Sequence, residues 1–170
     1  TLKAKYSGQS KNEVSEKNPF EKLDLTIGKI ISVEKHPNAD KLFIEKVDLG
    51  NKTVQIVSGL AKHYKPAELK GKNVILITNL EPAVLRGIES KGMLLAAEKN
   101  NEVKILEANK SHPGDKVFAE DMTSNPEKQI TITEFSHVKM TTKEGKVYYK
   151  GHKLRTEHED VSCNIADDAE

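Results

Sequence analysis

The chain has 170 residues, 36% hydrophobic and 31% charged, which allows one ordinary domain or one small domain with a smaller companion and excludes a wholly disordered protein. Its formal net charge of +1 excludes a strongly basic or acidic protein, and no apolar run approaches the ~20 residues of a membrane span. The lone cysteine, Cys163, can form no disulfide within the chain, and residues 1–17 resemble no signal peptide, so we expect a cytoplasmic protein without membrane contact.

The first 18 residues are polar and lysine-rich, which predicts a flexible tail or linker, with folding starting at Pro19 and Phe20. Short β-strands follow. Apolar alternation predicts a long first strand from Leu25 to Val33, and its change of phase after Gly28 suggests a bulge or a sharp coil there. Residues 36–40 form a turn cluster, and residues 42–49 and 53–57 are predicted as the second and third strands.

Residues 58–71 are irregular, with one possible helical turn at 66–69, and a continuous apolar strand covers residues 73–80. A hairpin is predicted from 93–98 and 103–107, joined at Asn100 and Asn101, followed by a turn at 111–115 and a strand at Val117 and Phe118. Five main strands with one irregular crossing segment match the size of an OB-fold barrel. We therefore expect an all-β to α+β protein whose OB-fold covers residues 19–118.

Residues 119–170 are predicted to form a small C-terminal domain packed on the barrel, because so short a segment cannot bury a core of its own. Alternating Ile and Thr favour a strand at residues 129–135, and residues 146–150 begin a hairpin that turns at Gly151 and His152. The net charge is +2 over residues 1–23 (five basic, three acidic), +3 over 24–118 (fifteen and twelve) and −4 over 119–170 (seven and eleven). Attraction for phosphates should therefore come from the first two segments.

No enzyme motif is present. The chain has neither GxxxxGK[ST] nor GxGxxG, and its six histidines, at positions 36, 63, 112, 137, 152 and 158, lack the spacing of a metal site. We expect no catalysis, no metal and no cofactor.

Residues 79–93 stand out as an exposed loop between two strands. The loop contains two glycines, a serine, a lysine and Arg86, whose planar guanidinium suits phosphates and base edges. The alternative is a polar hairpin whose glycines serve turn geometry alone, and the pattern by itself favours that alternative.

Order and spacing of several motifs resemble the tRNA-binding domain family typified by endothelial monocyte-activating polypeptide II. This family includes C-terminal domains of methionyl- and tyrosyl-tRNA synthetases and cofactors of multi-synthetase complexes. The matching segments are LTIGKII at 25–31, HPNADKL at 36–42, VSGL at 57–60, the loop 79–93 and PGD at 113–115.

The resemblance implies an OB-fold followed by a small domain that imitates the second subunit of dimeric bacterial forms, and therefore a monomer. It implies a non-catalytic module that binds the outside corner of tRNA, with little sequence preference, and delivers it to an aminoacyl-tRNA synthetase in cis or in trans. It also suggests a helix at residues 129–135, which we prefer over the strand. The residues it implies for tRNA binding are Asn79, Arg86, Ser90, Lys91 and Met93, with Lys35 and Lys41 beside the His-Pro turn as further phosphate contacts or, equally, plain surface lysines.

Two departures put the affinity in question: Glu81 and Val84 stand where many eukaryotic members carry lysines. Two alternative functions stay open. One is a cytokine-like polypeptide released by proteolysis and secreted, and the other is a protein–protein docking module. The cytokine activity of relatives is ascribed to the segment occupied here by Thr26, Ile27, Gly28, Lys29, Ile30, Ile31 and Ser32.

Overall fold

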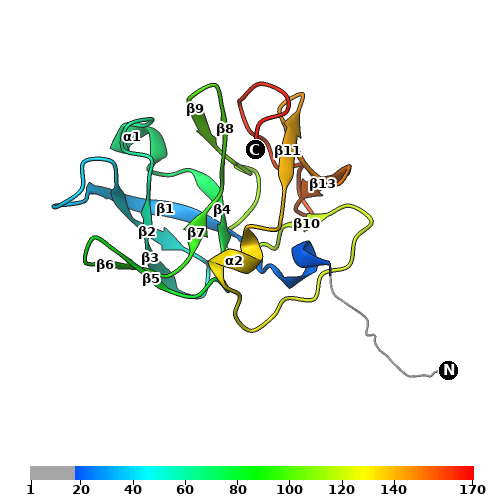
Figure 1. The fold of residues 1–170 in the computed structure, drawn as a ribbon, viewed down its shortest axis with the longest axis horizontal. Helices are drawn as coiled ribbons and strands as arrows, with labels where there is room; N and C mark the ends of the chain where they lie inside the picture. The colour runs from blue at the N-terminus through cyan, green and yellow to red at the C-terminus, as the bar shows by residue number, and fades with distance from the viewer. Residues whose placement is uncertain (1–17) are drawn as a thin grey trace.

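A computed structural model describes residues 18–170, so the predicted tail lies outside the described residues except for Asn18. The described chain begins with a short 3-10 helix, η1 (Pro19–Lys22), whose N-cap is Asn18: its side-chain oxygen accepts a hydrogen bond from the Phe20 amide. Figure 1 shows a curled sheet on one side and a smaller β unit on the other, with η1 beside the smaller unit. Among residues 18–170, no helix has the length and apolarity that crossing a membrane would require.

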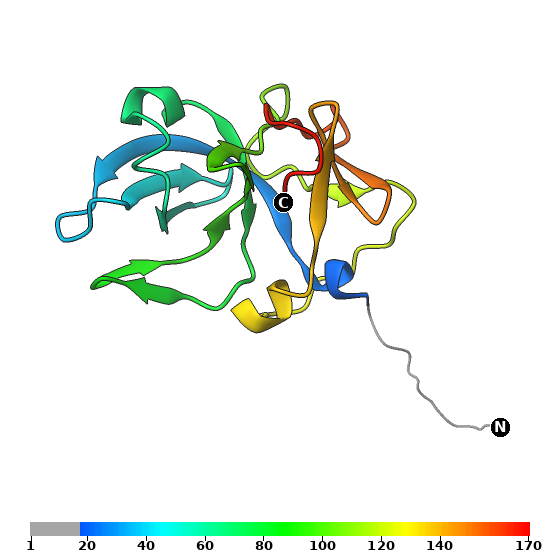
Figure 2. The same ribbon diagram turned by 45° about the horizontal axis from the view of Figure 1, so that its top comes forward.

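The larger unit is a five-stranded antiparallel sheet in the order β3-β2-β1-β4-β7, which confirms the OB-like fold. Its strands are β1 (Leu25–Lys35), β2 (Phe43–Asp48), β3 (Thr53–Ser58), β4 (Asn73–Ile77) and β7 (Met93–Leu94). The central strand β1 is long because it serves two partners: its first half pairs with β4 and its second half with β2. The predicted helical turn is α1 (Pro66–Leu69), which lies over β1 at one end of the sheet (Figures 1 and 2).

The predicted bulge at Gly28 was placed wrongly. The register between β1 and β2 shifts between Ile30 and Ser32, which leaves Ile31 unpaired and 44% exposed. Gly28 has a different purpose: a Cβ atom there would overlap Cγ1 of Val47 in the barrel core. The glycine in the pattern thus marks close packing, and the strand bends three residues later.

The predicted 93–98 strand is split in two. β7 pairs with β4, whereas β8 (Ala96–Lys99) pairs with β9 (Glu102–Ile105) in a separate hairpin. The break is at Leu95, whose amide donates to the Ile75 carbonyl. Asn100 and Asn101 form the tip with φ angles of 54° and 68°, as expected of the residues that best tolerate this backbone.

The smaller unit contains a four-stranded sheet in the order β10-β13-β12-β11. Its elements are β10 (Phe118–Ala119), α2 (Ile132–Phe135), β11 (Met140–Lys143), β12 (Lys146–Tyr149) and β13 (His152–Arg155). The helix implied by the resemblance occurs only at 132–135, because Ile130 is extended and forms a parallel bridge with Leu80. The last hairpin turns at Lys150 and Gly151, one residue earlier than predicted, since these two residues have the positive φ angles, 48° and 84°.

The buried apolar residues form two clusters. One fills the barrel and includes Ile30, Phe43 and Ile56. The other is shared between the units: Ile27 and Ile75 of the barrel belong to the same cluster as Leu154, Val161 and other residues of the smaller unit. The C-terminal segment therefore packs on the barrel over a common core. The strand β10 spans positions 118 and 119, the expected boundary, and pairs with β13.

Candidate nucleic-acid interface

The predicted exposed loop is a β-hairpin made of β5 (Ala83–Leu85) and β6 (Ile88–Ser90). Arg86 and Gly87 are its two turn residues, with φ angles of 52° and 89°, which is the backbone of a two-residue hairpin turn. The hairpin projects from the barrel end near the loop that joins β1 to β2, in both ribbon views (Figures 1 and 2). The guanidinium of Arg86 is therefore carried at an exposed tip.

His36 fastens the hairpin tip to the loop at residues 36–42. Its Nε2 lies 3.0 Å from the Leu85 carbonyl oxygen, and its Nδ1 accepts a hydrogen bond of 3.0 Å from the Asn38 amide. Because Nδ1 is an acceptor, the proton is on Nε2, which donates to Leu85. The sequence suggested only a turn residue. The ring is 4% exposed and joins two loops, which spacing alone did not indicate.

Ser90 connects the hairpin to the barrel edge. Its Oγ accepts from the Val57 amide at 2.9 Å and donates to the Gly92 carbonyl at 3.0 Å. Beside it, the Lys91 amide donates to the Gln55 carbonyl. These bonds join β3 to the segment that leads into β7, so they bring the two edges of the sheet together. Ser90 is 4% exposed and its hydroxyl both donates and accepts a hydrogen bond within the protein. Its place in the structure is therefore to hold the hairpin against the barrel edge.

Asn79 is also a supporting residue in the structure. Its Oδ1 accepts from the Asp24 amide at 3.0 Å, and its Nδ2 donates to the carbonyls of Lys22 and Glu127 at 2.8 and 2.9 Å. Both amide protons are used, and the residue is 9% exposed. Met93, in β7, is half-buried and packs against the shared core. Of the five motif residues, only Arg86 and Lys91 present a charge to solvent.

The structure brings Arg86 and Lys41 together. They line one shallow groove of about 500 Å³ with the backbone and side chains of residues 38–40 and Leu42. Lys35 lies nearby in the chain, at the exposed end of β1. Within residues 18–170, neither Arg86 nor Lys41 nor Lys35 has an acidic side chain within ion-pair distance, whereas Lys91 lies 3.9 Å from Glu89. Three cations at one end of the barrel are thus free to meet phosphates.

The structure also shows the surroundings of Glu81 and Val84, which depart from the family pattern, and of the segment Thr26–Ser32. Glu81 is half-buried where its amide donates to Ile130, and Val84 is 68% exposed on β5. The segment Thr26–Ser32 forms the middle of β1, hydrogen-bonded on both sides, and only Lys29 and Ile31 in it are exposed. Its apolar pattern is explained by barrel packing.

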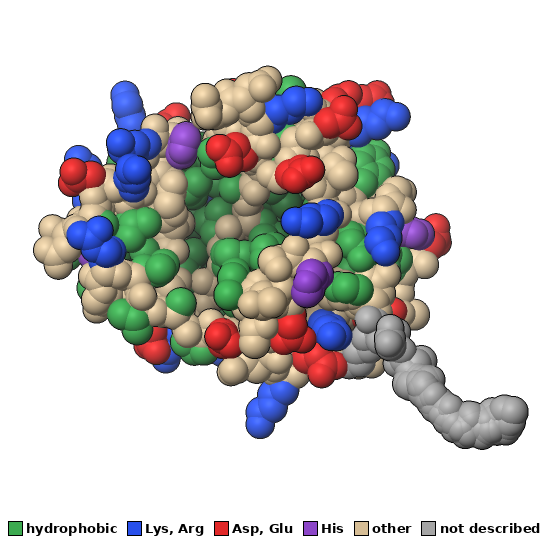
Figure 3. All heavy atoms as spheres, viewed as in Figure 1, with side chains coloured by type: hydrophobic (Ala, Val, Ile, Leu, Met, Phe, Trp, Pro, Cys, Tyr) green, Lys and Arg blue, Asp and Glu red, His purple; other side chains and the backbone are tan. Residues whose placement is uncertain are grey.

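Figure 3 shows a second hollow, lined by green apolar side chains, at the junction of the two units. It has a volume of about 270 Å³, and its walls come from β8 with the adjoining Leu95, from the segment between Phe135 and Thr142, and from the last two residues of the chain. Its apolar walls do not suit a phosphate backbone. On the same face, Lys and Arg side chains gather at the end of the barrel near α1 and the 36–42 loop, and acidic side chains are more frequent elsewhere (Figure 3).

Comparison with known proteins shows which family the chain belongs to. Residues 25–116 match the family model described as "Putative tRNA binding domain". Methionine–tRNA ligase of Pyrococcus furiosus is 50% identical over 109 residues, 62% of this chain and 15% of that protein. The methionine–tRNA ligase of Borrelia garinii subsp. bavariensis is 41% identical over 171 residues, 92% of this chain and 23% of that protein. The chain thus spans less than a quarter of either relative.

Among solved structures, the C-terminal domain of Plasmodium vivax p43 aligns with a TM-score of 0.83 and 27% identity, over 88% of this chain and 97% of that one. A MetRS-related protein from Pyrococcus horikoshii aligns at 0.57 with 34% identity, over 63% and 100%. At 88% of the chain, the first likeness extends over both units, whereas the family model covers the barrel part. The chain belongs to the tRNA-binding domain family.

Proposed function

We propose that this chain is the non-catalytic tRNA-binding module of a methionyl-tRNA synthetase and that it grips tRNA with the barrel end built from the β5–β6 hairpin and the 36–42 loop. Family membership supports binding to tRNA, and the relatives named methionine–tRNA ligase support the choice of synthetase. The observation that carries the choice of surface is the groove shared by Arg86 and Lys41, whose cations are unpaired within the described residues.

The binding mechanism follows from these groups. Lys and Arg neutralise phosphates and release counterions, which gives an affinity that depends on salt and little on sequence. The rigid hairpin, held by His36 and Ser90, presents Arg86 in a fixed orientation to the shape and 2′-hydroxyls of folded RNA, for which we propose the outside corner of tRNA. Joined to a synthetase, the module raises the effective concentration of tRNA near a catalytic site located elsewhere.

We further propose that the module is monomeric. The C-terminal unit already covers part of the barrel through the shared core, so that face has no need of a second copy. Light scattering at micromolar concentration tests this, and a stable dimer would contradict it.

The direct test of the surface is tRNA binding by fluorescence anisotropy, measured over a range of salt concentrations. Arg86→Ala should cost about 1–3 kcal/mol, roughly five- to 150-fold in Kd, if the guanidinium makes a bidentate or stacked contact. Lys143→Ala, which removes an exposed cation from β11 of the smaller unit, is the matched control and should change little. Equal losses for both variants would mean bulk attraction, and the hairpin would not be the site.

A gain of function gives a sharper test. Glu81→Lys with Val84→Lys introduces two positive charges and removes one negative charge from the proposed surface. It should tighten binding and steepen the log–log salt slope by ~0.7–0.9 for each new phosphate contact. The control is Glu144→Lys with Thr141→Lys, which makes the same charge change at exposed positions of another hairpin, β11–β12. If the control tightens binding as much, the attraction is again nonspecific.

The cytokine-like function and the docking function stay predictions. Thr26–Ser32 lies inside the central strand and supplies no observation in favour of a receptor contact. A receptor assay with a scrambled segment, and capture of a synthetase by the isolated chain, would test them separately.

A further inference from the structure

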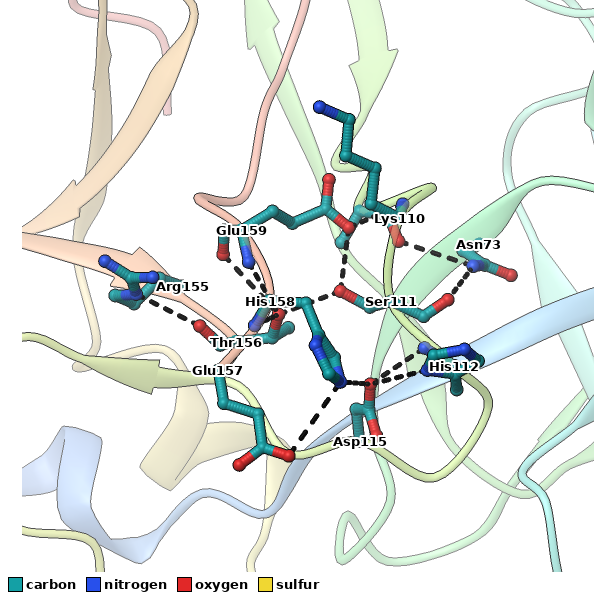
Figure 4. A network of polar contacts seen from close by, with 11 residues as sticks. Asn73, Lys110, Ser111, His112, Asp115, Arg155, Thr156, Glu157, His158 and Glu159 are labelled. Carbon is teal, nitrogen blue, oxygen red and sulfur yellow. Dashed lines mark hydrogen bonds and ion pairs between the residues drawn. The ribbon is translucent and has the colours of Figure 1, made fainter.

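We propose that His112, Asp115 and His158 bind one zinc ion where the barrel meets the C-terminal unit. The possible ligand atoms of the three side chains all lie within 4.8 Å of one another. Nδ1 of His112 is 3.7 Å from Oδ2 of Asp115, and Nε2 of His158 is 3.5 Å from the same oxygen. Figure 4 shows both rings turned toward this carboxylate.

These separations suit a tetrahedral metal. Zinc bonds to nitrogen and oxygen of about 2.0–2.1 Å place neighbouring ligand atoms about 3.3 Å apart. Two of the pairs are already within a few tenths of an ångström of that value. The side chains of His112 and His158 are 73% and 41% exposed, so their rings can close the remaining gap without moving the backbone.

The ligands come from two loops that are already fixed. Oγ of Ser111 lies 2.8 Å from Oγ1 of Thr156 and 2.7 Å from Oε2 of Glu159, which joins the turn at 111–115 to the turn at 156–159 (Figure 4). Thr156 Oγ1 also accepts from the amides of His158 and Glu159, which shapes the second turn. These bonds fix both turns and leave the proposed ligand atoms available, so the site is preorganised.

Asp115 is oriented as well. Its Oδ2 accepts from the His112 amide at 2.8 Å, and 21% of its side chain is exposed. Two imidazoles and one carboxylate are a donor set that zinc accepts, with a fourth position for water. Glu157 is a further oxygen donor near this position, since its Oε1 lies 3.8 Å from Nε2 of His158.

Spacing in the sequence pointed away from metal, because the two histidines are 46 positions apart and only folding joins them. His112 and Asp115 fall within the residues matched by the family model and His158 falls outside them. A metal bound by all three would therefore clamp the C-terminal unit to the barrel. The inference does not depend on the RNA proposal, since it uses other loops.

The test uses the untagged chain, freed of metals by a chelator. Isothermal titration and equilibrium dialysis with zinc should give one ion per chain, and cobalt should give the visible absorption of a low-symmetry site. His112→Ala and His158→Ala should each weaken zinc binding at least about tenfold. They should also abolish the rise in unfolding temperature that zinc causes in the unchanged protein. His137→Ala, another exposed imidazole, is the matched control and should leave both results unchanged.

Asp115→Asn serves as a second variant, because an amide oxygen can still accept from the His112 backbone while the charge is lost. Circular dichroism must show that each variant is folded. Saturable binding that survives both histidine variants would overturn the proposal, and so would the absence of saturable binding by the unchanged protein.

Discussion

The buried carboxyl of Glu45 should make the free energy of unfolding depend on pH, by an amount that follows from its surroundings. Its side chain points into the barrel from β2 and is 0% exposed, between the buried Phe43 and Val47. Oε2 accepts from the Ser58 hydroxyl at 2.7 Å, but Oε1 has no hydrogen-bond partner among the described residues. Burial raises the pKa of this carboxyl from 4.5 to about 7, and the Ser58 bond opposes that rise.

The direction of the pH effect is fixed by this pKa. The folded chain holds the proton more tightly than the unfolded chain, so the stabilisation is complete below pH ~4.5 and is lost as the pH rises through about 7. At ~1.4 kcal/mol per unit of pKa, Glu45 should lower the free energy of unfolding by roughly 2–3 kcal/mol between pH 5 and pH 8. The Glu45→Gln variant should lack this loss, because its side chain does not titrate.

The assay is urea denaturation of the unchanged protein and Glu45→Gln at several pH values from 5 to 8. Subtraction of the two free energies cancels the other titrating groups, and the difference should move in favour of the variant as the pH rises. Glu34→Gln, at an exposed position of β1, is the control. Parallel pH profiles for the unchanged protein and Glu45→Gln would refute the reasoning, whatever constant offset the amide introduces.

Two further predictions concern the core. Gly28→Ala should lower the free energy of unfolding by about 1–3 kcal/mol, because its Cβ overlaps Val47 in a filled barrel. Gly59→Ala, where a Cβ has no neighbour within 4 Å, should cost far less in the same urea titration, and equal costs would disprove the packing argument. Cys163 is 2% exposed, and burial raises the pKa of its thiol to about 11, so a thiol reagent at pH 8 should label it rapidly only in denaturant. Rapid labelling of the folded protein would contradict this.

The strands β1 to β4 were predictable because each has apolar residues in a strand pattern and most end at residues with special turn geometry. The Asn100-Asn101 tip and the strands on either side of Gly50 are examples, where local sequence and tertiary pairing agree. Predictions failed where a distant partner decides the conformation. Ile130 was expected in a helix, but its bridge to Leu80 holds it extended, and the bulge in β1 is set by pairing with β2.

The candidate site shows the same division. A basic residue at a hairpin tip is visible in the sequence, since Arg86-Gly87 is a turn signal in a charged stretch. The hydrogen bond between His36 and the hairpin could not be predicted from the sequence, because its acceptor, the Leu85 carbonyl, is 49 positions away. The same holds for the His112, Asp115 and His158 cluster, whose members meet only after the C-terminal unit has packed on the barrel.

Measurements on Asn79 can distinguish a direct RNA contact from a structural role. The resemblance implied an RNA contact, but the side chain ties together the segments at Lys22, Asp24 and Glu127 with three hydrogen bonds. Asn79→Ala would leave a buried amide and carbonyls without their partners, so the free energy of unfolding should fall by about 1–3 kcal/mol. At a temperature where both variants stay folded, its tRNA affinity should fall less than that of Arg86→Ala. If Asn79→Ala weakens tRNA binding as much as Arg86→Ala and leaves the unfolding midpoint unchanged, Asn79 contacts the RNA directly, and the supporting role inferred from its bonds is wrong.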